Sequence, residues 1–232
     1  MPQTYIALIR HAQYHQRANT PSAFQPYPLT EAGEKQSRQC ALALNDFCQQ
    51  HHSAITQIHS STLLRAWQTA QLCMNSLAPQ FNSANKIIES DALCERSVGS
   101  LANLTINEIE DIIKKDPRLQ SPIPHWKSDS YYRLPYPGAE SLIQAGERVA
   151  QYIKQQINSQ STMQKNQLIL FFAHGASLRH AAYQLGILKF EQIKQLSMFH
   201  AQPVIFHLND SAPLLPVYGD WKVRSQSSEY RD

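Results

Sequence analysis

Two histidines, two arginines and a pair of serines follow runs of apolar residues that predict strands. These groups are Arg10-His11 after the first run, Ser60-Ser61 with Arg65 after the second, and His174-Gly175 after the most apolar one. Because ligands of open parallel sheets bind at the carboxyl ends of the strands, we expect the groups to converge on one pocket. Helices beginning just after Ser61 and Gly175 would add backbone N–H groups and positive dipole ends. The pattern predicts a site for a dianion.

These side chains suit phosphoryl transfer. Imidazole can act as a nucleophile, and guanidinium groups match the phosphoryl oxygens as charge spreads over them. No two of the seven glycines lie two positions apart, so a dinucleotide-binding loop is absent, and so are a Walker A loop and a G-x-S-x-G motif. Side chains must therefore hold any phosphate.

The spacing of His11 and His15 argues against a metal site. It places two imidazoles on one face only in a helix, whereas the segment follows a predicted strand and leads into a proline-rich loop. We therefore expect no metal and no other cofactor.

The elements that would position these groups follow from apolar periodicity and turn residues. Apolar runs predict strands over 5–9, 55–59, 86–89, 168–173, 203–208 and 214–218. Helical spacing predicts helices over 30–50, 63–77, 105–115, 140–158, 177–185 and 190–198. Thr30 is expected to cap the first helix, and Ser60 or Ser61 the second. Alternating strands and helices indicate an α/β fold, a three-layer αβα sandwich around a mostly parallel sheet.

Residues 101–137 interrupt this alternation. Five of the thirteen prolines fall between Pro117 and Pro137, together with Trp126 and three tyrosines. We expect this segment to be an insertion that serves as an aromatic lid over the site. The whole chain, 1–232, is expected to be a single domain whose polar tail, about 220–232, is mobile.

The composition limits the class of protein and its partners. With 42% hydrophobic and 17% charged residues the chain is expected to form a globular core. A net charge of +3, from 21 basic and 18 acidic residues, does not indicate a surface that binds nucleic acid. The longest apolar run, Leu168 to Ala173, is too short to cross a membrane, and no secretory signal is recognisable. We expect a cytoplasmic protein whose four cysteines are reduced, and the oligomeric state stays open.

Six motifs, in order along nearly the whole chain, resemble the histidine phosphatase, or phosphoglycerate mutase-like, superfamily. The run from Ile6 to Ala12 (IALIRHA) is similar to the family's strand followed by Arg-His-Gly. The other five are LTEAG at 29–33, SSTLLRAWQTA at 60–70, LCE at 93–95 with a glycine four residues later, PGAES at 137–141 and AHG at 173–175. The resemblance implies a phosphoglycerate mutase-like fold and a hydrolase that needs no metal.

The resemblance also implies roles. His11 would be the nucleophile that forms a phosphohistidine, Arg10, Arg65 and His174 would bind the phosphoryl group, and Glu95 would donate the proton to the leaving oxygen. His174 would lie opposite His11 and count among the catalytic residues. His11 must be neutral to attack, and its other ring nitrogen needs an acceptor, for which we expect a backbone carbonyl. If Glu95 is not the acid, Glu89 or Asp91 would take its place.

Ala12 departs from the family's glycine, which is tolerated unless φ is positive there. The loop Gln13-Tyr-His-Gln-Arg17 also lacks the Trp-Asn pair of the glycolytic mutases. We therefore expect a phosphatase acting on a phosphorylated small molecule or a phosphoprotein. The run from Arg10 to His15 is similar to that of a mitochondrial protein Ser/Thr phosphatase branch. Two competing hypotheses are a mutase and a catalytically silent protein that binds a phosphorylated ligand.

Substrate choice is expected to lie in the variable loops. Tyr14, Arg17 and Tyr132 are the candidate substrate-binding residues. Further loop candidates are His15, Tyr27, Trp126, Lys127 and Arg133. Arg179, one helical turn after Gly175, is expected to make a structural pairing instead.

Overall fold

The computed structural model describes residues 2–21, 23–84, 86–158, 165–208 and 215–224. A six-stranded sheet forms its centre, in the order β3-β2-β4-β1-β6-β7. The strands are β1 (Thr4–Arg10), β2 (Ser53–Ser61), β3 (Ile87–Ser90), β4 (Asn166–Ala173), β6 (Pro203–His207) and β7 (Pro216–Tyr218). The first four strands run parallel to one another, while β6 and β7 are antiparallel additions at one edge.

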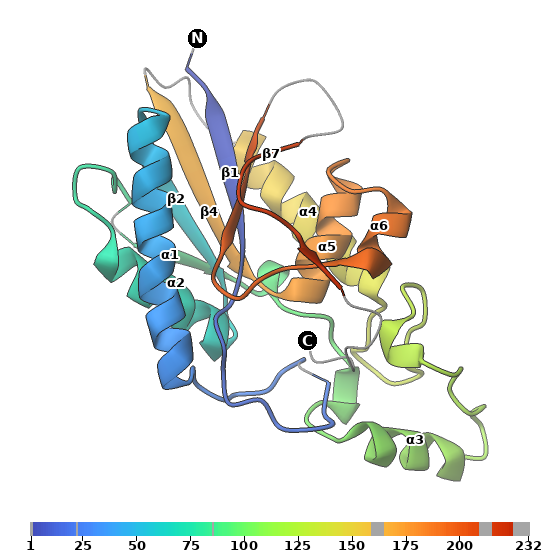
Figure 1. The fold of residues 1–232 in the computed structure, drawn as a ribbon. Helices are drawn as coiled ribbons and strands as arrows, with labels where there is room; N and C mark the ends of the chain where they lie inside the picture. The colour runs from blue at the N-terminus through green and yellow to red at the C-terminus, as the bar shows by residue number, and fades with distance from the viewer. Residues whose placement is uncertain (1, 22, 85, 159–164, 209–214, 225–232) are drawn as a thin grey trace.

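Helices cover both faces of this sheet, which confirms the predicted three-layer α/β sandwich (Figure 1). One face carries α1 (Glu31–Gln50) and α2 (Leu64–Ser76), and the other carries α4 (Leu142–Asn158) and α5 (Gly175–Gln184), with α6 (Phe190–Gln195) beside α5. Alternate residues of β1 show the division, since Ala7 and Ile9 pack toward α1 and α2 whereas Ile6 and Leu8 pack toward α4 and α5. A strand buried on both faces is continuously apolar, as in this run.

The insertion has an apolar cluster of its own. Ile109 and Ile113 of α3 (Ile106–Lys115) pack with Trp126, Leu134 and Ala23. Thr105 and Glu108 close the α3 N-terminus with a reciprocal capping box. The short 3₁₀ helix Trp126–Ser128 lies in this segment, and another, Gly99–Leu101, leads into it. The insertion is therefore packed against the loop that follows β1.

The predicted cap of α2 and the predicted start of α5 differ from the structure for a shared reason. Neither Ser60 nor Ser61 caps α2, because β2 continues through both and pairs with its neighbours; the N-cap is Leu63. Helix α5 begins at Gly175, two residues before the predicted start, because the Glu95 carboxylate accepts the N–H groups of Ala176 and Ser177. In both cases a distant part of the chain, not the local sequence, fixes the helix terminus.

The C-terminal part also differs from the prediction. Helix α6 ends at Gln195, because β5 (Leu196–Ser197) pairs with β8 (Lys222–Val223) as a separate two-stranded sheet. Of the tail predicted to be mobile, residues 220–224 include this strand, and 225–232 lie outside the described residues, as does Leu214 of the predicted last strand. The four cysteines are buried and free, as predicted. Within the described ranges, no helix is both long and apolar enough to cross a membrane.

Candidate active site

His11 and His174 lie side by side at the carboxyl ends of two neighbouring strands. The parallel register of β1 and β4 pairs Arg10 with Ala173, and the His11 N–H donates to the Ala173 carbonyl at 2.9 Å. The two imidazole rings have centroids 5.2 Å apart, and both side chains are buried. The predicted convergence of the Arg-His and His-Gly pairs is therefore seen in the structure.

A backbone carbonyl orients the His11 ring, as expected. Nδ1 lies 2.8 Å from the Ala12 carbonyl oxygen. Because a carbonyl can only accept, Nδ1 carries the proton and Nε2 keeps its lone pair. Ala12 does not have a positive φ, so its Cβ is accommodated without backbone strain. Its N–H donates to Thr69 Oγ1 at 2.9 Å, which fixes the turn directly after His11.

The surroundings keep His11 neutral. Burial lowers the pKa of His11 well below its ordinary value, and the positive charge of Arg65, the His174 ring and Arg10 add to this effect. Burial, Arg65 and Arg10 lower the pKa of His174 in the same direction. A neutral imidazole with a free lone pair on Nε2 is the form that can attack phosphorus.

Backbone carbonyl groups hold the guanidinium groups of Arg10 and Arg65 in place. The fully buried Arg65 donates to the carbonyls of Gln25 and Ala23, each at 3.2 Å, and its guanidinium lies 4.8 Å from the centre of the Tyr14 ring. Arg10 donates to the Met198 carbonyl at 3.2 Å. Such fixed guanidinium groups bind phosphoryl oxygens with little further loss of side-chain freedom.

His174 has one ring nitrogen held and one left over. Nε2 lies 2.9 Å from Ser61 Oγ at the end of β2, and the same oxygen lies 3.3 Å from Cys94 Sγ. When the Ser61 hydroxyl donates to Nε2, the ring proton of neutral His174 is on Nδ1. Nδ1 is buried and has no hydrogen-bond partner among the described residues. A buried polar atom without a partner is uncommon and requires an explanation such as a bound ligand. His174 therefore has a ring nitrogen available to a phosphoryl group.

Glu95 lies at the start of α5, where the sequence predicted an open anion site. Its carboxylate accepts N–H groups from Ala176 at 3.2 Å, Ser177 at 3.1 Å and Arg96 at 2.8 Å. The Ala176 and Ser177 N–H groups of this helix terminus are therefore already satisfied by the carboxylate and do not face an open anion site. Glu95 is buried beside the segment that carries His174.

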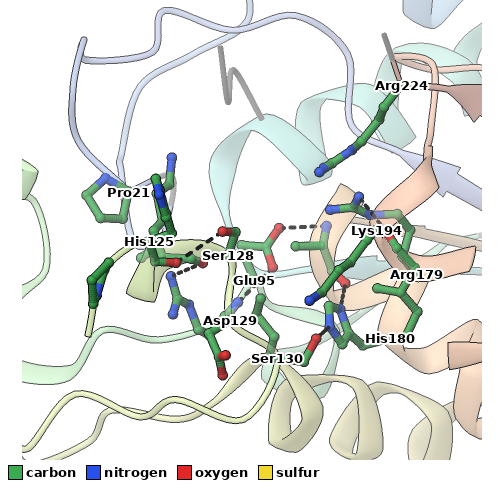
Figure 2. A pocket seen from close by; sticks show the side chains of 17 residues that line it. Pro21, Glu95, His125, Ser128, Asp129, Ser130, Arg179, His180, Lys194 and Arg224 are labelled. Atoms are coloured by element: carbon green, nitrogen blue, oxygen red, sulfur yellow. Dashed lines mark hydrogen bonds between the residues drawn. The ribbon is translucent and has the colours of Figure 1, made fainter. Parts of the chain in front are cut away.

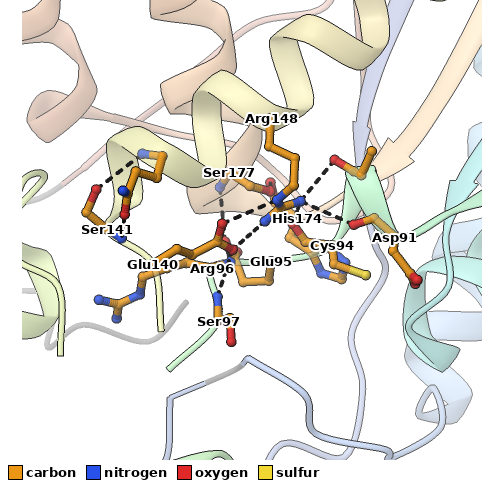
Figure 3. Close-up of polar contacts among 12 residues, drawn as sticks. Asp91, Cys94, Glu95, Arg96, Ser97, Glu140, Ser141, Arg148, His174 and Ser177 are labelled. Atoms are coloured by element: carbon orange, nitrogen blue, oxygen red, sulfur yellow. Dashed lines mark hydrogen bonds and ion pairs between the residues drawn. The ribbon is translucent and has the colours of Figure 1, made fainter. Parts of the chain in front are cut away.

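A partly buried network that sequence reasoning missed holds the Glu95 segment in place (Figure 3). Arg148 of α4 donates to the carbonyls of Asp91, Ala92 and Cys94, and forms an ion pair with Glu140. The Glu140 carboxylate in turn accepts the Ser97 N–H at 3.0 Å. Arg148 is eight residues beyond the glutamate of the PGAES motif, and this spacing within one predicted helix was the only signal available for it.

A cavity of about 360 Å³ adjoins Glu95 (Figure 2). Its walls come from the loop after β1, the insertion, α5, α6 and the end of β8. Of the predicted loop candidates, Lys127 lines it. This volume is within the range of small-molecule pockets.

Each of the three candidate substrate-binding residues contacts other parts of the chain. Tyr14 is buried, and its ring packs edge-on against His11 with centroids 5.2 Å apart. Arg17 donates to the Asn103 carbonyl at 2.6 Å and so joins the first loop to the insertion. Tyr132 packs against Trp126 in the insertion cluster. None of the three lines the cavity beside Glu95.

Sequence reasoning also missed His200, and it placed Arg179 correctly. The His200 ring centroid lies 5.7 Å from that of His11, and His200 reaches it from the connection before β6, which carries no recognisable motif. Arg179 donates to the carbonyls of Gly175, Ile193 and Leu196, the structural pairing expected. In the described part of the chain, no three His, Cys, Asp or Glu side chains are grouped so as to hold a metal ion.

Buried neutral histidines predict a loss of stability in acid. Burial lowers the pKa of His59 and His180 to about 4 and of His200 to about 3. Since the unfolded chain takes up these protons near pH 6.5, the free energy of unfolding should fall as the pH drops from about 6.5 toward 4. Between about pH 7.5 and 5.5, the free energy of unfolding measured by urea denaturation should fall by about 1.3 kcal/mol less in His180→Gln than in wild type. The exposed His15→Gln serves as control, and an unchanged slope in His180→Gln would contradict the expectation.

Comparison with known proteins identifies one superfamily, in which the similar proteins include both a mutase and phosphatases. The model of the histidine phosphatase superfamily (branch 1) matches residues 6–220. The chain is 28% identical over 206 residues to the 2,3-bisphosphoglycerate-dependent phosphoglycerate mutase of Parvibaculum lavamentivorans, covering 88% of this chain and 90% of that one. A mycobacterial glucosyl-3-phosphoglycerate phosphatase has a TM-score of 0.68 at 18% identity, covering 96% and 100%. The α-ribazole phosphatase of Shigella flexneri has a TM-score of 0.66 at 18% identity, and the match covers 91% of this chain and 96% of that one. These likenesses confirm the phosphoglycerate mutase-like fold.

Proposed function

Because the chain belongs to the histidine phosphatase superfamily (branch 1), we propose that it is a metal-independent phosphatase that hydrolyses a phosphomonoester through a phosphohistidine on His11. The observation that carries the proposal is the state of His11. Its Nδ1 is bound by the Ala12 carbonyl, and its pKa is lowered by burial and by two arginines, so a neutral Nε2 is available beside cationic groups. This is the arrangement that nucleophilic attack on a phosphoryl group requires.

In the first step, His11 Nε2 forms a bond to phosphorus while the bond from phosphorus to the leaving oxygen breaks. Arg10, Arg65 and His174 bind the three peripheral oxygens, where charge builds up. Glu95 gives its proton to the leaving oxygen, which departs as an alcohol. The products of this step are a phosphohistidine and a Glu95 carboxylate.

In the second step, the Glu95 carboxylate takes a proton from a water molecule, whose oxygen attacks the phosphohistidine. The bond between phosphorus and Nε2 breaks, and inorganic phosphate leaves. The step returns neutral His11 and protonated Glu95, so the acid and base roles of Glu95 exchange between the two halves of the cycle.

A mutase is the second candidate, favoured by the curated relative that is a phosphoglycerate mutase. It would pass the phosphoryl group from His11 to another hydroxyl instead of to water. The loop Gln13 to Arg17 lacks the Trp-Asn pair of the glycolytic mutases, which supports the phosphatase. The phosphatase could also act on a phosphoprotein. A silent protein that only binds a phosphorylated ligand is disfavoured by the buried set of His11, Glu95 and His174, which supports an active enzyme.

The test measures release of inorganic phosphate in EDTA from an aryl phosphate and from a panel of sugar phosphates, nucleotides and phosphopeptides. We expect release from at least one class, undiminished by EDTA, because side chains take the place of a metal. Positional isomers of a substrate without release of phosphate would favour the mutase. Tight binding of a phosphorylated ligand without either reaction would favour the binding protein.

A further inference from the structure

The cavity beside Glu95 is strongly basic. Five cationic side chains and two carboxylates line it: Arg96, Lys127, Arg179, Lys194 and Arg224 against Glu95 and Asp129. Both carboxylates are engaged by backbone N–H groups, three on Glu95 and two on Asp129. The cavity therefore has an excess of positive charge beyond what phosphate binding at His11 uses.

This cavity borders the proposed phosphoryl site at Glu95, although Arg10, His11, Arg65 and His174 do not line it. Glu95, the proposed acid for the leaving oxygen, forms part of its wall, as does Ala176, two residues after His174. Ala23 lines it as well, and the Ala23 carbonyl accepts a hydrogen bond from Arg65. The group attached to the leaving oxygen would thus enter this cavity while the phosphoryl group is bound at His11.

The cations on the α6 side are gathered by backbone contacts (Figure 2). The Arg224 N–H donates to the Gln195 carbonyl at 2.9 Å, which brings Arg224 next to Lys194. Arg179 is fixed between α5 and α6 by three carbonyls. Neither Lys194 nor Arg224 makes an ion pair with the described residues. The charges of Lys194 and Arg224 are therefore available to an anion in the cavity, whose attraction must exceed the side-chain entropy lost on binding.

We infer that the substrate's leaving group carries a second anionic group, a carboxylate or a phosphate, which binds Lys194 and Arg224 across the cavity from Glu95. The inference rests on the proposed function, since it assigns the cavity to the leaving group. Arg224 lies beyond residues 6–220 that match the family model, so this chain's own C-terminal segment contributes to the selectivity. The size of the cavity, about 360 Å³, fits a small anionic molecule.

The test uses the wild-type protein and phosphonates, whose carbon–phosphorus bond is not hydrolysed. Calorimetry would compare para-carboxybenzylphosphonate with para-carbamoylbenzylphosphonate, which has the same shape without the second charge. We expect the carboxylate to bind at least about tenfold more tightly, the usual effect of a charge-assisted hydrogen bond. A third ligand, para-xylylenebisphosphonate, tells whether the second anion is better recognised as a carboxylate or as a phosphoryl-like group.

Two substitutions locate the effect. In the double variant Lys194→Gln and Arg224→Gln the preference for the charged ligand should fall to about twofold or less, with the carbamoyl ligand bound as before. Lys35→Gln removes an exposed charge from α1 on the other face of the sheet and should leave the preference unchanged.

Equal affinity of wild type for the charged and neutral ligands, or no binding of either, would overturn the inference. So would a preference that survives in the double variant. These measurements need no turnover, so they are independent of phosphate release. If the protein binds the charged ligand selectively but hydrolyses no ester, the anion subsite stands and the phosphatase proposal fails.

Discussion

Replacing His11 with alanine should lower phosphate release by at least about ten-thousandfold, because no other side chain can form the covalent intermediate. His174, the neighbouring imidazole, has Nε2 against Ser61 Oγ, and its Nδ1 is proposed to bind the phosphoryl oxygens. Initial rates with an aryl phosphate would measure the loss.

The intermediate itself can be trapped. Brief mixing of wild type with a phosphorus-labelled substrate, followed by quenching in base, should leave label on the protein that acid removes, as a phosphoramidate requires. His11→Ala should carry no label. The exposed His15→Ala is the matched control, since it changes an imidazole of the same loop four residues away and should keep both label and rate. Full activity in His11→Ala would disprove the proposed nucleophile.

The parts of the site that sequence predicted are those fixed by strand ends. An apolar run buried on both faces indicates a parallel strand, and the residue after it must lie at the carboxyl edge of the sheet. His11 and His174 satisfy this rule because β1 and β4 are adjacent and in register. The same reasoning named Arg65, which follows the second strand, and the family motifs then added Glu95, whose chemistry no spacing could reveal.

What sequence could not predict depends on contacts between distant segments. The start of α5 is set by Glu95, about eighty residues earlier in the chain, so the local sequence could not reveal its capping group. The end of α6 is set by pairing with β8. Arg148 resembles any helical arginine until its three carbonyl partners are seen. Pattern rules treat neighbours along the chain, and tertiary pairing overrides them.

The candidate substrate residues show a further limit. Aromatic and basic side chains on loops commonly bind ligands, which is why Tyr14, Arg17 and Tyr132 are candidates from sequence. In the structure, Tyr14 packs between His11 and Arg65, and the other two stabilise the insertion. The cavity is instead lined by Lys194 and Arg224, which lie in segments without a motif. Composition alone cannot tell a packed loop side chain from one that faces a ligand.

Glu95→Gln should produce the second largest loss, and its size should depend on the leaving group. With alkyl phosphates, whose alkoxide leaves poorly, we expect kcat to fall by about a hundredfold to ten-thousandfold, the usual range for general acid–base catalysis. With para-nitrophenyl phosphate the leaving phenolate needs no proton, so formation of the phosphohistidine should be nearly unaffected. The burst of para-nitrophenol should persist while its later steady release slows, because water attack still needs a base.

The position of Glu95 makes glutamine the right substitution and supplies the control. The glutamine amide oxygen can still accept an N–H from α5, whereas alanine would leave the Ala176 and Ser177 donors buried and unsatisfied. A loss in Glu95→Gln with an unchanged melting temperature therefore reports on proton transfer and not on capping. Glu89→Gln, which changes an exposed side chain of β3, and Asp91→Asn, whose carboxylate accepts from Thr62, should retain activity on alkyl phosphates. If one of these lost activity while Glu95→Gln did not, that residue would be the proton donor. The leaving-group dependence is the decisive measurement, because a buried carboxylate that only caps a helix would affect good and poor leaving groups alike.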